Sequence, residues 1–272
     1  MSRTLASLVV GFARLITLPT SQRQRARVYA RIKDHFDRAV VHIAATRHGD
    51  LRFYTNRGAA AASALHTFQG DEPETISWID DEVEPGDVVW DVGANVGLYS
   101  CYAAKAGARV LAFEPSGINF GLLVAHVELN GLDQSVAPYC LALTDTTRAT
   151  ELFTSSFEPG HAFNAIDSPE SQFSAFKPKF RQAILGFAAD DLVDRFGLAS
   201  PDHLKLDVDG AEIAILKGAG KVLGKVRTLI MEIEGRNRDL FDDEIAPLLD
   251  RAGLSHAGSW EDGARNQLFT RK

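Results

Sequence analysis

Residues 88–99 read Val88-Val89-Trp90-Asp91-Val92-Gly93-Ala94-Asn95-Val96-Gly97-Leu98-Tyr99. An apolar run that ends in an acid, a turn with two glycines and the start of a helix follow one another here. A second apolar run, 109–114, ends in Glu114. In a parallel α/β sheet, ligands bind where the strands end, and an acid at the end of the second strand suits the hydroxyls of a ribose. The stretch therefore predicts a nucleoside-binding turn.

The turn differs from that of a dinucleotide site, which has Gly-x-Gly-x-x-Gly where this chain has Gly-Ala-Asn-Val-Gly. No arginine follows Glu114 to hold a ribose phosphate. Gly93 and Gly97 let the backbone bend and present its N–H groups to a ligand. Asp91, just before the turn, would repel a pyrophosphate but suits the sulfonium and amino groups of S-adenosylmethionine. The sequence therefore predicts that cofactor.

Strands and helices alternate from residue 88 onward, which predicts an α/β fold with a doubly wound, mostly parallel seven-stranded sheet. Strands are expected at 88–92, 109–114, 136–142, 203–208 and 227–233, with a last pair near 254–260 and 266–271. Helices are expected near 97–106, 117–129, 189–196, 212–218 and 242–252. Cys101 and Cys140 show no disulfide or metal spacing, which favours a reducing, cytoplasmic location.

Residues 1–70 are expected to form a basic extension, and 71–272 the main domain. Residues 1–60 carry eleven Lys/Arg and three Asp, a net charge of +8 that leaves −15 for the rest of the chain. The extension should hold helices at 1–18, 21–39 and 59–67 and a hairpin of 41–44 with 51–54. The first helix is amphipathic and too short to span a bilayer. Packing on the domain or in a homodimer is favoured over peripheral contact with an anionic membrane surface.

The segment from about 154 to 182 is rich in Ser, Pro and Phe, and no regular element is expected in it. A long loop in a compact domain is typical of a lid over a substrate, and its phenylalanines (Phe157, Phe163, Phe173, Phe176 and Phe180) argue against disorder. His161 in this loop is a candidate catalytic base.

Acidic residues follow two of the expected strands. In the run 205–212, Asp207 and Asp209 should share one strand face, and Glu232 ends the next strand. These three side chains join His161 as candidates for the base that an alcohol nucleophile requires. They are also the ligands that a Mg²⁺ ion would use, although a metal-free site is favoured.

The chain resembles the FkbM family of S-adenosylmethionine-dependent methyltransferases over roughly 72–257. The resemblance rests on motifs in a fixed order: Glu72-Pro73-Glu74, Asp91 to Gly97, Phe113-Glu114-Pro115, Asn119, Asn130, Ala142-Leu143 with Asp145, and Lys205 to Glu212. Asp209 stands where the family usually has Glu. The resemblance implies a class I methyltransferase fold whose last strand runs antiparallel to the rest.

It also implies methyl transfer to a hydroxyl oxygen of a sugar, glycolipid or polyketide-type molecule. Carried over by position, the turn would surround the methionine part of the cofactor, Glu114 would hold the ribose, Ala142 would lie by the adenine and Asp207 near the reacting methyl. The cofactor-binding candidates are Glu74, Asp91, Gly93, Ala94, Asn95, Gly97, Glu114, Pro115, Ser116, Asn119, Ala142 and Asp207.

Two alternatives stay open. One is a methyltransferase that acts on nitrogen or on a macromolecule. Nucleic acid is disfavoured as a partner, because the body of the chain carries −15. The other is a non-catalytic scaffold whose basic arm binds a membrane or a partner. The presence of both Asp91 and Glu114 argues against the scaffold.

Overall fold

The computed structural model describes residues 2–162, 164–169, 175–258 and 265–271, with side chains from residue 7 onward. The calls on Phe163, on Phe173 and on the strand end at 259–260 lie outside these residues. Contacts between Cα atoms divide the chain into two compact units, Met1–His42 and Ile43–Lys272. The boundary therefore lies well before the expected one at residue 70.

The first unit is built from two helices, α1 (Ser2–Thr17) and α2 (Gln22–Ala39). The side chain of Ser21 and that of Gln24 cap the start of α2 reciprocally. The hydroxyls of Thr17 and Tyr29 lie 3.2 Å apart and join the two helices. Strand β1 (Val41–Ala44) leads into the second unit and pairs with β2 (Leu51–Tyr54), as the hairpin prediction required.

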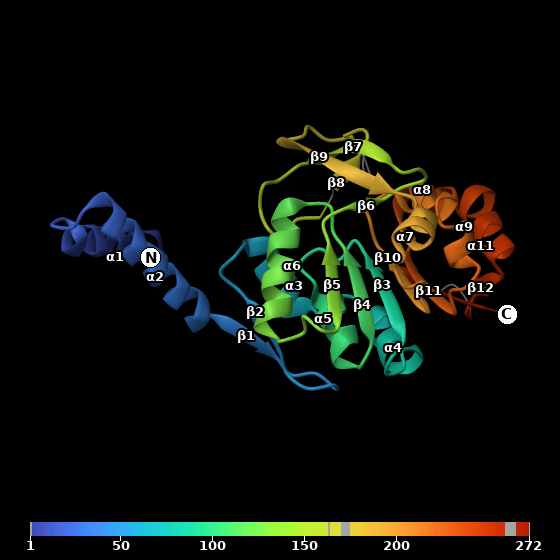
Figure 1. Ribbon diagram of the computed structural model, residues 1–272, viewed down its shortest axis with the longest axis horizontal. Coiled ribbons are helices and arrows are strands. Elements are labelled where there is room, and N and C mark those ends of the chain that lie inside the picture. Colours follow the sequence, from blue (N-terminus) through green and yellow to red (C-terminus); the bar gives the residue numbers. More distant parts are fainter. Residues whose placement is uncertain (1, 163, 170–174, 259–264, 272) are drawn as a thin grey trace. The chain divides into compact units, whose positions relative to one another are not determined.

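The second unit contains a seven-stranded sheet with the order β12-β13-β11-β10-β3-β4-β5 (Figure 1). Its strands are β3 (Val88–Val92), β4 (Arg109–Phe113), β5 (Val136–Tyr139), β10 (His203–Leu206), β11 (Thr228–Glu232), β12 (Leu254–His256) and β13 (Asn266–Arg271). Neighbouring strands from β11 to β5 run parallel, and β13 is antiparallel to both of its neighbours. The prediction of a mostly parallel sheet with an antiparallel last strand is confirmed.

Helices cover both faces of this sheet. They are α3 (Ala59–Thr67), α4 (Pro73–Glu82), α5 (Leu98–Lys105), α6 (Gly117–Leu129), α7 (Ala189–Phe196), α8 (Glu212–Lys217), α9 (Gly220–Leu223), α10 (Gly235–Asp239), the π-helix η1 (Phe241–Ile245) and α11 (Ala246–Ala252). Successive side chains of β3 point to opposite faces of the sheet. Trp90 and Val92 join the core under α7, α8, α9 and α11. Asp91 points the other way, and the register places it opposite Lys205 of β10.

A second sheet, which the sequence did not predict, has the order β6-β9-β7-β8. It consists of β6 (Ala142–Leu143), β7 (Arg148–Thr154), β8 (Asn164–Ile166) and β9 (Phe180–Phe187), and Figure 1 shows it across one end of the main sheet. Two expectations were therefore wrong. The expected strand 136–142 ends at Tyr139, and the expected loop 154–182 contains β8 and the start of β9.

Strand β2 and α3 belong to the second unit, and polar contacts hold both in place. In α3, the Ala61 N–H donates to the Pro159 carbonyl at 3.2 Å. The Tyr54 N–H donates to Nε2 of buried His126 at 3.1 Å, and the His126 Nδ1–H donates to the Val96 carbonyl at 2.8 Å. Burial lowers the pKa of His126 to about 4, so the ring is neutral and one tautomer serves both bonds. Among the described residues, no helix is long and apolar enough to cross a membrane.

Candidate functional site

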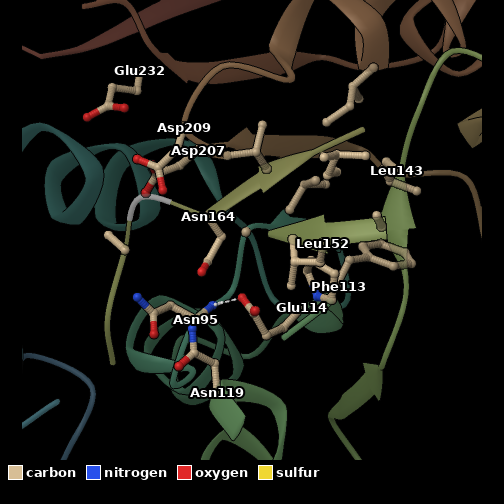
Figure 2. Close-up of a pocket in the computed structure, with 18 of the residues that line it drawn as sticks. Asn95, Phe113, Glu114, Asn119, Leu143, Leu152, Asn164, Asp207, Asp209 and Glu232 are labelled. Carbon is tan, nitrogen blue, oxygen red and sulfur yellow. Dashed lines mark hydrogen bonds between the residues drawn. The ribbon is translucent and has the colours of Figure 1, made fainter. Parts of the chain in front are cut away.

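A cavity of about 260 Å³ lies where β3, β4, β10 and β11 end, beneath the second sheet (Figure 2). Its polar lining is Glu72, Asn95, Glu114, Asn119, His161, Asn164, Asp207, Asp209, Glu232, Glu234 and Arg265. Its other lining residues are Val92, Gly93, Phe113, Pro115, Leu141, Ala142, Leu143, Leu152, Ala162, Ile166, Val208 and Ile215. The second sheet thus supplies much of the apolar wall.

The turn after β3 fits tightly against β10. Gly93 has φ +84°, and a Cβ there would lie 1.7 Å from the Asp207 carbonyl oxygen, so only glycine fits. The N–H groups of Gly93 and Ala94 both donate to the Phe113 carbonyl, each at 3.0 Å. The neighbouring strand end thus already satisfies these two N–H groups.

Glu114 is held from both sides by backbone. The Asn95 N–H donates to its Oε2 at 2.9 Å, and the Ser116 N–H donates to its Oε1 at 2.8 Å. Burial raises its pKa to about 8, although these donors and Asn119 favour the charged form. The residue lines the cavity, and a carboxylate accepts more hydrogen bonds than these three. Glu114 is therefore a carboxyl group of fixed position at the cavity wall.

Asn119 fastens the segment before β8 over this carboxylate. Its Oδ1 accepts from the Gly160 N–H at 2.9 Å, and its Nδ2 donates to the His161 carbonyl at 3.3 Å. Asn95 Nδ2 donates to the Gly160 carbonyl at 3.4 Å. Its Oδ1 is buried without a hydrogen-bond partner among the described atoms. The segment is thus pinned in place at the cavity wall.

Behind the turn, a buried ammonium group lies among carboxylates. Lys205 Nζ donates to Asp207 Oδ2 at 2.7 Å and lies 3.9 Å from Asp91 Oδ1. Burial lowers the pKa of Lys205, but Asp207, Asp91 and Glu72 outweigh it and raise the pKa overall. Burial raises the pKa of Asp91, whose Oδ1 accepts no hydrogen bond. The cluster carries more negative than positive groups and favours a cationic ligand.

A smaller cavity of about 120 Å³ adjoins this cluster. Lys205 and Tyr99 line it, and the ammonium lies 5.2 Å from the centre of the Tyr99 ring. Glu72, Gly93, Asn95 and Asp207 line both cavities, so the two share a wall. Burial raises the pKa of Glu72.

The other end of the main cavity is acidic and more open. Figure 2 shows Asp207, Asp209 and Glu232 away from Glu114, and all four line the cavity. The Asp207 side chain is 28% exposed. Of the described residues, no three or more His, Cys, Asp or Glu form a group that could hold a metal ion.

His161 also lines the cavity, and its Nε2 lies 2.7 Å from Ser155 Oγ. Burial lowers its pKa, so the imidazole is neutral near pH 7 and able to accept a proton. All four candidate catalytic residues are therefore at the cavity. One expectation about them was wrong. Asp207 and Asp209 do not share a strand face, because β10 ends at Leu206 and Asp209 has φ +56°.

Most of the cofactor candidates lie at or directly behind the two cavities, and two of them do not. The cavity brings together Gly93, Asn95, Glu114, Pro115, Asn119, Ala142 and Asp207. Ala94 lines the smaller cavity, while Asp91 and Ser116 support the site from behind. Gly97 has a packing role, since a Cβ there would lie 2.3 Å from Leu123 Cδ1. Glu74 is directed elsewhere: its Oε1 accepts from the Asn266 N–H at 3.2 Å.

Sequence reasoning missed Glu72 and the second sheet. Glu72 precedes α4 and belongs to the same Glu-Pro-Glu run as Glu74, which was chosen instead. A proline at the first helical position marks the preceding residue as the helix boundary, and this signal favours Glu72 for a loop-facing role. In 180–187, apolar residues on both sides of the strand hid the alternation that predicts β9.

The fold and the site define a class I methyltransferase. Residues 91–255 match the family model described as the methyltransferase FkbM domain, and the chain belongs to that family. The match starts at Asp91 and includes the turn, Glu114, the second sheet, Asp207 and Asp209.

Two relatives are similar to this chain over more than half of its length. The hexuronic acid methyltransferase AglP of Haloferax volcanii is 29% identical over 185 residues, which are 68% of this chain and 70% of AglP. The 31-O-demethyl-FK506 methyltransferase FkbM of Streptomyces tacrolimicus is 26% identical over 176 residues, which are 56% of this chain and 67% of that protein.

Among solved structures, the methyltransferase FkbM from Methylobacillus flagellatus aligns with a TM-score of 0.46 and 19% identity. The alignment covers 78% of this chain and 53% of that one, so this chain spans about half of the crystallised protein. Magnesium protoporphyrin IX methyltransferase from Synechocystis, solved with bound S-adenosylmethionine, aligns with a TM-score of 0.46 and 15% identity.

Proposed function

We propose that this methyltransferase uses S-adenosylmethionine to methylate a hydroxyl oxygen of a sugar, glycolipid or polyketide-type molecule. The observation that carries the proposal is Glu114, a buried carboxylate whose two oxygens are positioned by backbone N–H groups at a cavity wall. A ribose presents two adjacent hydroxyls that a carboxylate of this kind accepts together.

The surroundings of Glu114 fit the rest of an adenosine. Phe113, Leu143, Leu152 and Ile166 give an apolar wall from both sheets, which suits the faces of a purine ring. Asn119 and Asn164 add amide groups on the same wall. The buried Oδ1 of Asn95, which has no hydrogen-bond partner among the described atoms, is a further acceptor for a ligand donor.

The cluster behind the turn fits the methionine part. Asp91, Glu72 and Asp207 outnumber the ammonium of Lys205, so a ligand with a sulfonium and an amino group compensates the excess negative charge. Lys205 at the wall of the smaller cavity suits the cofactor's carboxylate.

S-adenosylmethionine supplies an activated methyl group, so the chain's main tasks are to align an acceptor oxygen with it and to remove a proton. Asp207 lies at both cavities, and Lys205 fixes its Oδ2. We assign Asp207 the role of base, with Asp209, Glu232 and His161 as the other candidates at the same end. The hydroxyl of the acceptor would donate to the Asp207 carboxylate as its oxygen attacks.

The relatives support the acceptor class. One is named for a hexuronic acid and the other for 31-O-demethyl-FK506, so one name specifies a sugar acid and the other an acceptor that lacks an O-methyl group. The acidity of Asp207, Asp209, Glu232 and Glu234 favours a second candidate, N-methylation of an amine, because carboxylates attract an ammonium group.

Calorimetric titration tests the cofactor directly. S-adenosylmethionine and S-adenosylhomocysteine are titrated into the full chain and into Glu114→Ala. Exposed Glu128→Ala, on α6, is the matched control. We expect micromolar binding that Glu114→Ala weakens and Glu128→Ala leaves unchanged. Absence of binding by either nucleoside would contradict the proposal and favour the scaffold alternative.

The acceptor is then found by mass spectrometry. Sugars, glycolipids, polyketides and amines are incubated with the protein and cofactor, and the gain of one methyl group is measured. Alkaline stability of the product separates an ether from an ester, and fragmentation separates methylation on oxygen from that on nitrogen. Methylation of amines alone would replace the O-methyltransferase proposal with the second candidate.

A further inference from the structure

In the first unit, Met1–His42, helix α1 exposes its large apolar side chains from residue 8 onward. Within α1, Ala13 and Thr17 are the shielded positions among the described side chains, and Thr17 faces Tyr29 of α2. Leu8, Phe12 and Leu15 are 65%, 65% and 63% exposed. A helix packed against a partner buries its large apolar side chains, whereas α1 exposes them.

Four of the exposed apolar side chains of α1 lie on one face of the helix, while exposed Val10 lies on the opposite side. Leu8, Phe12, Leu15 and Ile16 follow the spacing of three, four and eight residues that aligns side chains along a helix. Leu18 continues the apolar surface just beyond the helix. In residues 7–42, the buried side chains are the polar Thr17 and Asp37, so the unit has no apolar core of its own in this part.

The same unit is strongly basic. Residues 1–42 carry eight Lys/Arg and two Asp, a net charge of +6 that leaves −13 for residues 43–272. Arg23, Arg27 and Arg31 are exposed and follow one another at intervals of four along α2, on one face of that helix. An exposed apolar face beside a basic helix is typical of a unit that lies in the interface of an anionic membrane.

We propose that this helical unit docks on an anionic phospholipid surface, with the α1 face at Leu8, Phe12, Leu15 and Ile16 inserted among the lipids and the arginines of α2 at the headgroups. Charge favours this occupant over a second copy docked through the same face, because pairing two such units brings +6 against +6.

The rest of the chain offers no matching apolar face among its described residues. Its exposed large apolar side chains are Ile43, Val124 and Phe196 on three different elements, Phe180 and Leu185 on β9, and Phe157, whose ring centre lies 5.3 Å from that of Phe180. Of these elements none presents more than two such side chains, whereas α1 presents four on one face. An acidic surface without an apolar face satisfies the arginines of α2 but leaves the α1 face in water. A lipid surface satisfies both.

Vesicle sedimentation of the full chain tests the proposal. The vesicles are phosphatidylcholine alone or phosphatidylcholine with phosphatidylglycerol. We expect at least about tenfold tighter binding to the anionic vesicles, weakened by high salt. The variants Leu8→Asp/Phe12→Asp and Arg27→Glu/Arg31→Glu should each lose at least about tenfold in affinity.

Matched controls change the same chemistry in the other unit. Val124→Asp places a charge on an exposed apolar position of α6, and Arg109→Glu/Lys225→Glu reverses two exposed positive charges. Both should sediment like the wild type. Circular dichroism and S-adenosylmethionine titration show whether each variant is folded, and neither measurement should change.

Three results would overturn the proposal. One is no sedimentation with either vesicle. Another is sedimentation that is equal with both lipids and unchanged in both α1 and α2 variants. The third is a dimer, seen by sedimentation equilibrium without lipid, that Leu8→Asp/Phe12→Asp dissociates while vesicles fail to bind. That result would assign the α1 face to a second copy of the chain.

Discussion

The two ends of the cavity hold their carboxylates in different ways. At one end, Glu114 is buried and fixed by two backbone N–H groups. At the other end, Asp207, Asp209 and Glu232 are partly exposed, and the contact that positions Asp207 is the side chain of Lys205. The first arrangement suits a ligand that is the same in every turnover. The second suits an acceptor that differs between family members, since side chains change without altering the backbone.

The largest expected effect separates chemistry from cofactor binding. Replacement of Asp207 by Asn should lower kcat by ~10²–10⁴-fold, because the acceptor hydroxyl loses its base. The dissociation constant of S-adenosylhomocysteine, measured by calorimetry, should change only a few-fold. Glu128→Gln on exposed α6 is the control. Unchanged kcat in Asp207→Asn would transfer the role of base to Asp209, Glu232 or His161.

Glu114→Ala should have the opposite signature. A hydrogen bond to a charged group contributes ~1.5–3 kcal/mol, and desolvation of the carboxylate offsets part of this gain. Loss of a carboxylate that accepts two ribose hydroxyls should therefore weaken cofactor binding by about 100-fold. With saturating cofactor, kcat should stay within a few-fold of the wild type. Steady-state kinetics separate the two parameters. Equal losses in both variants would remove the distinction between the two ends.

The fixed end also depends on His126, which joins the hairpin to the turn after β3. His126→Gln should lower the free energy of unfolding by about 1–3 kcal/mol, since two buried backbone groups lose their partner. Urea denaturation at pH 8 measures this loss. His66→Gln, within α3, is a matched substitution that should cost less.

The same histidine gives a pH dependence. Its pKa is lowered from 6.5 to about 4 in the folded chain, so only the unfolded chain takes up the proton between these values. Stability should therefore fall as the pH drops through this window, by up to about 1.4 kcal/mol per unit. Denaturation across the window should show a shallower slope for His126→Gln than for the wild type. Identical slopes would mean that the ring is not held neutral.

The smallest effect concerns the charge on Glu114. Burial raises its pKa to about 8, and hydroxyl donors favour the ionised form, so binding releases a proton below that pH. Adenosine itself has no group that titrates in this pH range. Its affinity should fall by up to about tenfold per unit below pH 8 in the wild type. In Glu114→Gln it should be independent of pH. A wild-type affinity that does not change from about pH 9 to about pH 6 would place the ribose elsewhere.

The features that the sequence predicted best are those that adjacent strands of the main sheet determine. Asp91, the Gly93 turn and Glu114 follow from strands that end beside one another, and the main sheet was confirmed almost strand by strand. The observed strand ends differ from the predicted ones where the chain turns sharply. Asp209 adopts φ +56°, which no alternation pattern indicates.

The predictions failed where the structure depends on contacts distant in sequence. β7 and β9 pair antiparallel across a long connection, so neither strand carries a local signal strong enough to predict their sheet. The choice of Glu74 over Glu72 failed for a similar reason, because the Asn266 amide that binds Glu74 comes from the last strand. The packing role of Gly97 required the position of Leu123 on α6.

A crystal structure with S-adenosylhomocysteine tests the central claim most directly. The account predicts both ribose hydroxyls within hydrogen-bond distance of the Glu114 carboxylate, the adenine between Phe113 and Leu152, and the amino acid end near Lys205 and Asp91. A nucleoside bound with its ribose away from Glu114 would contradict the account.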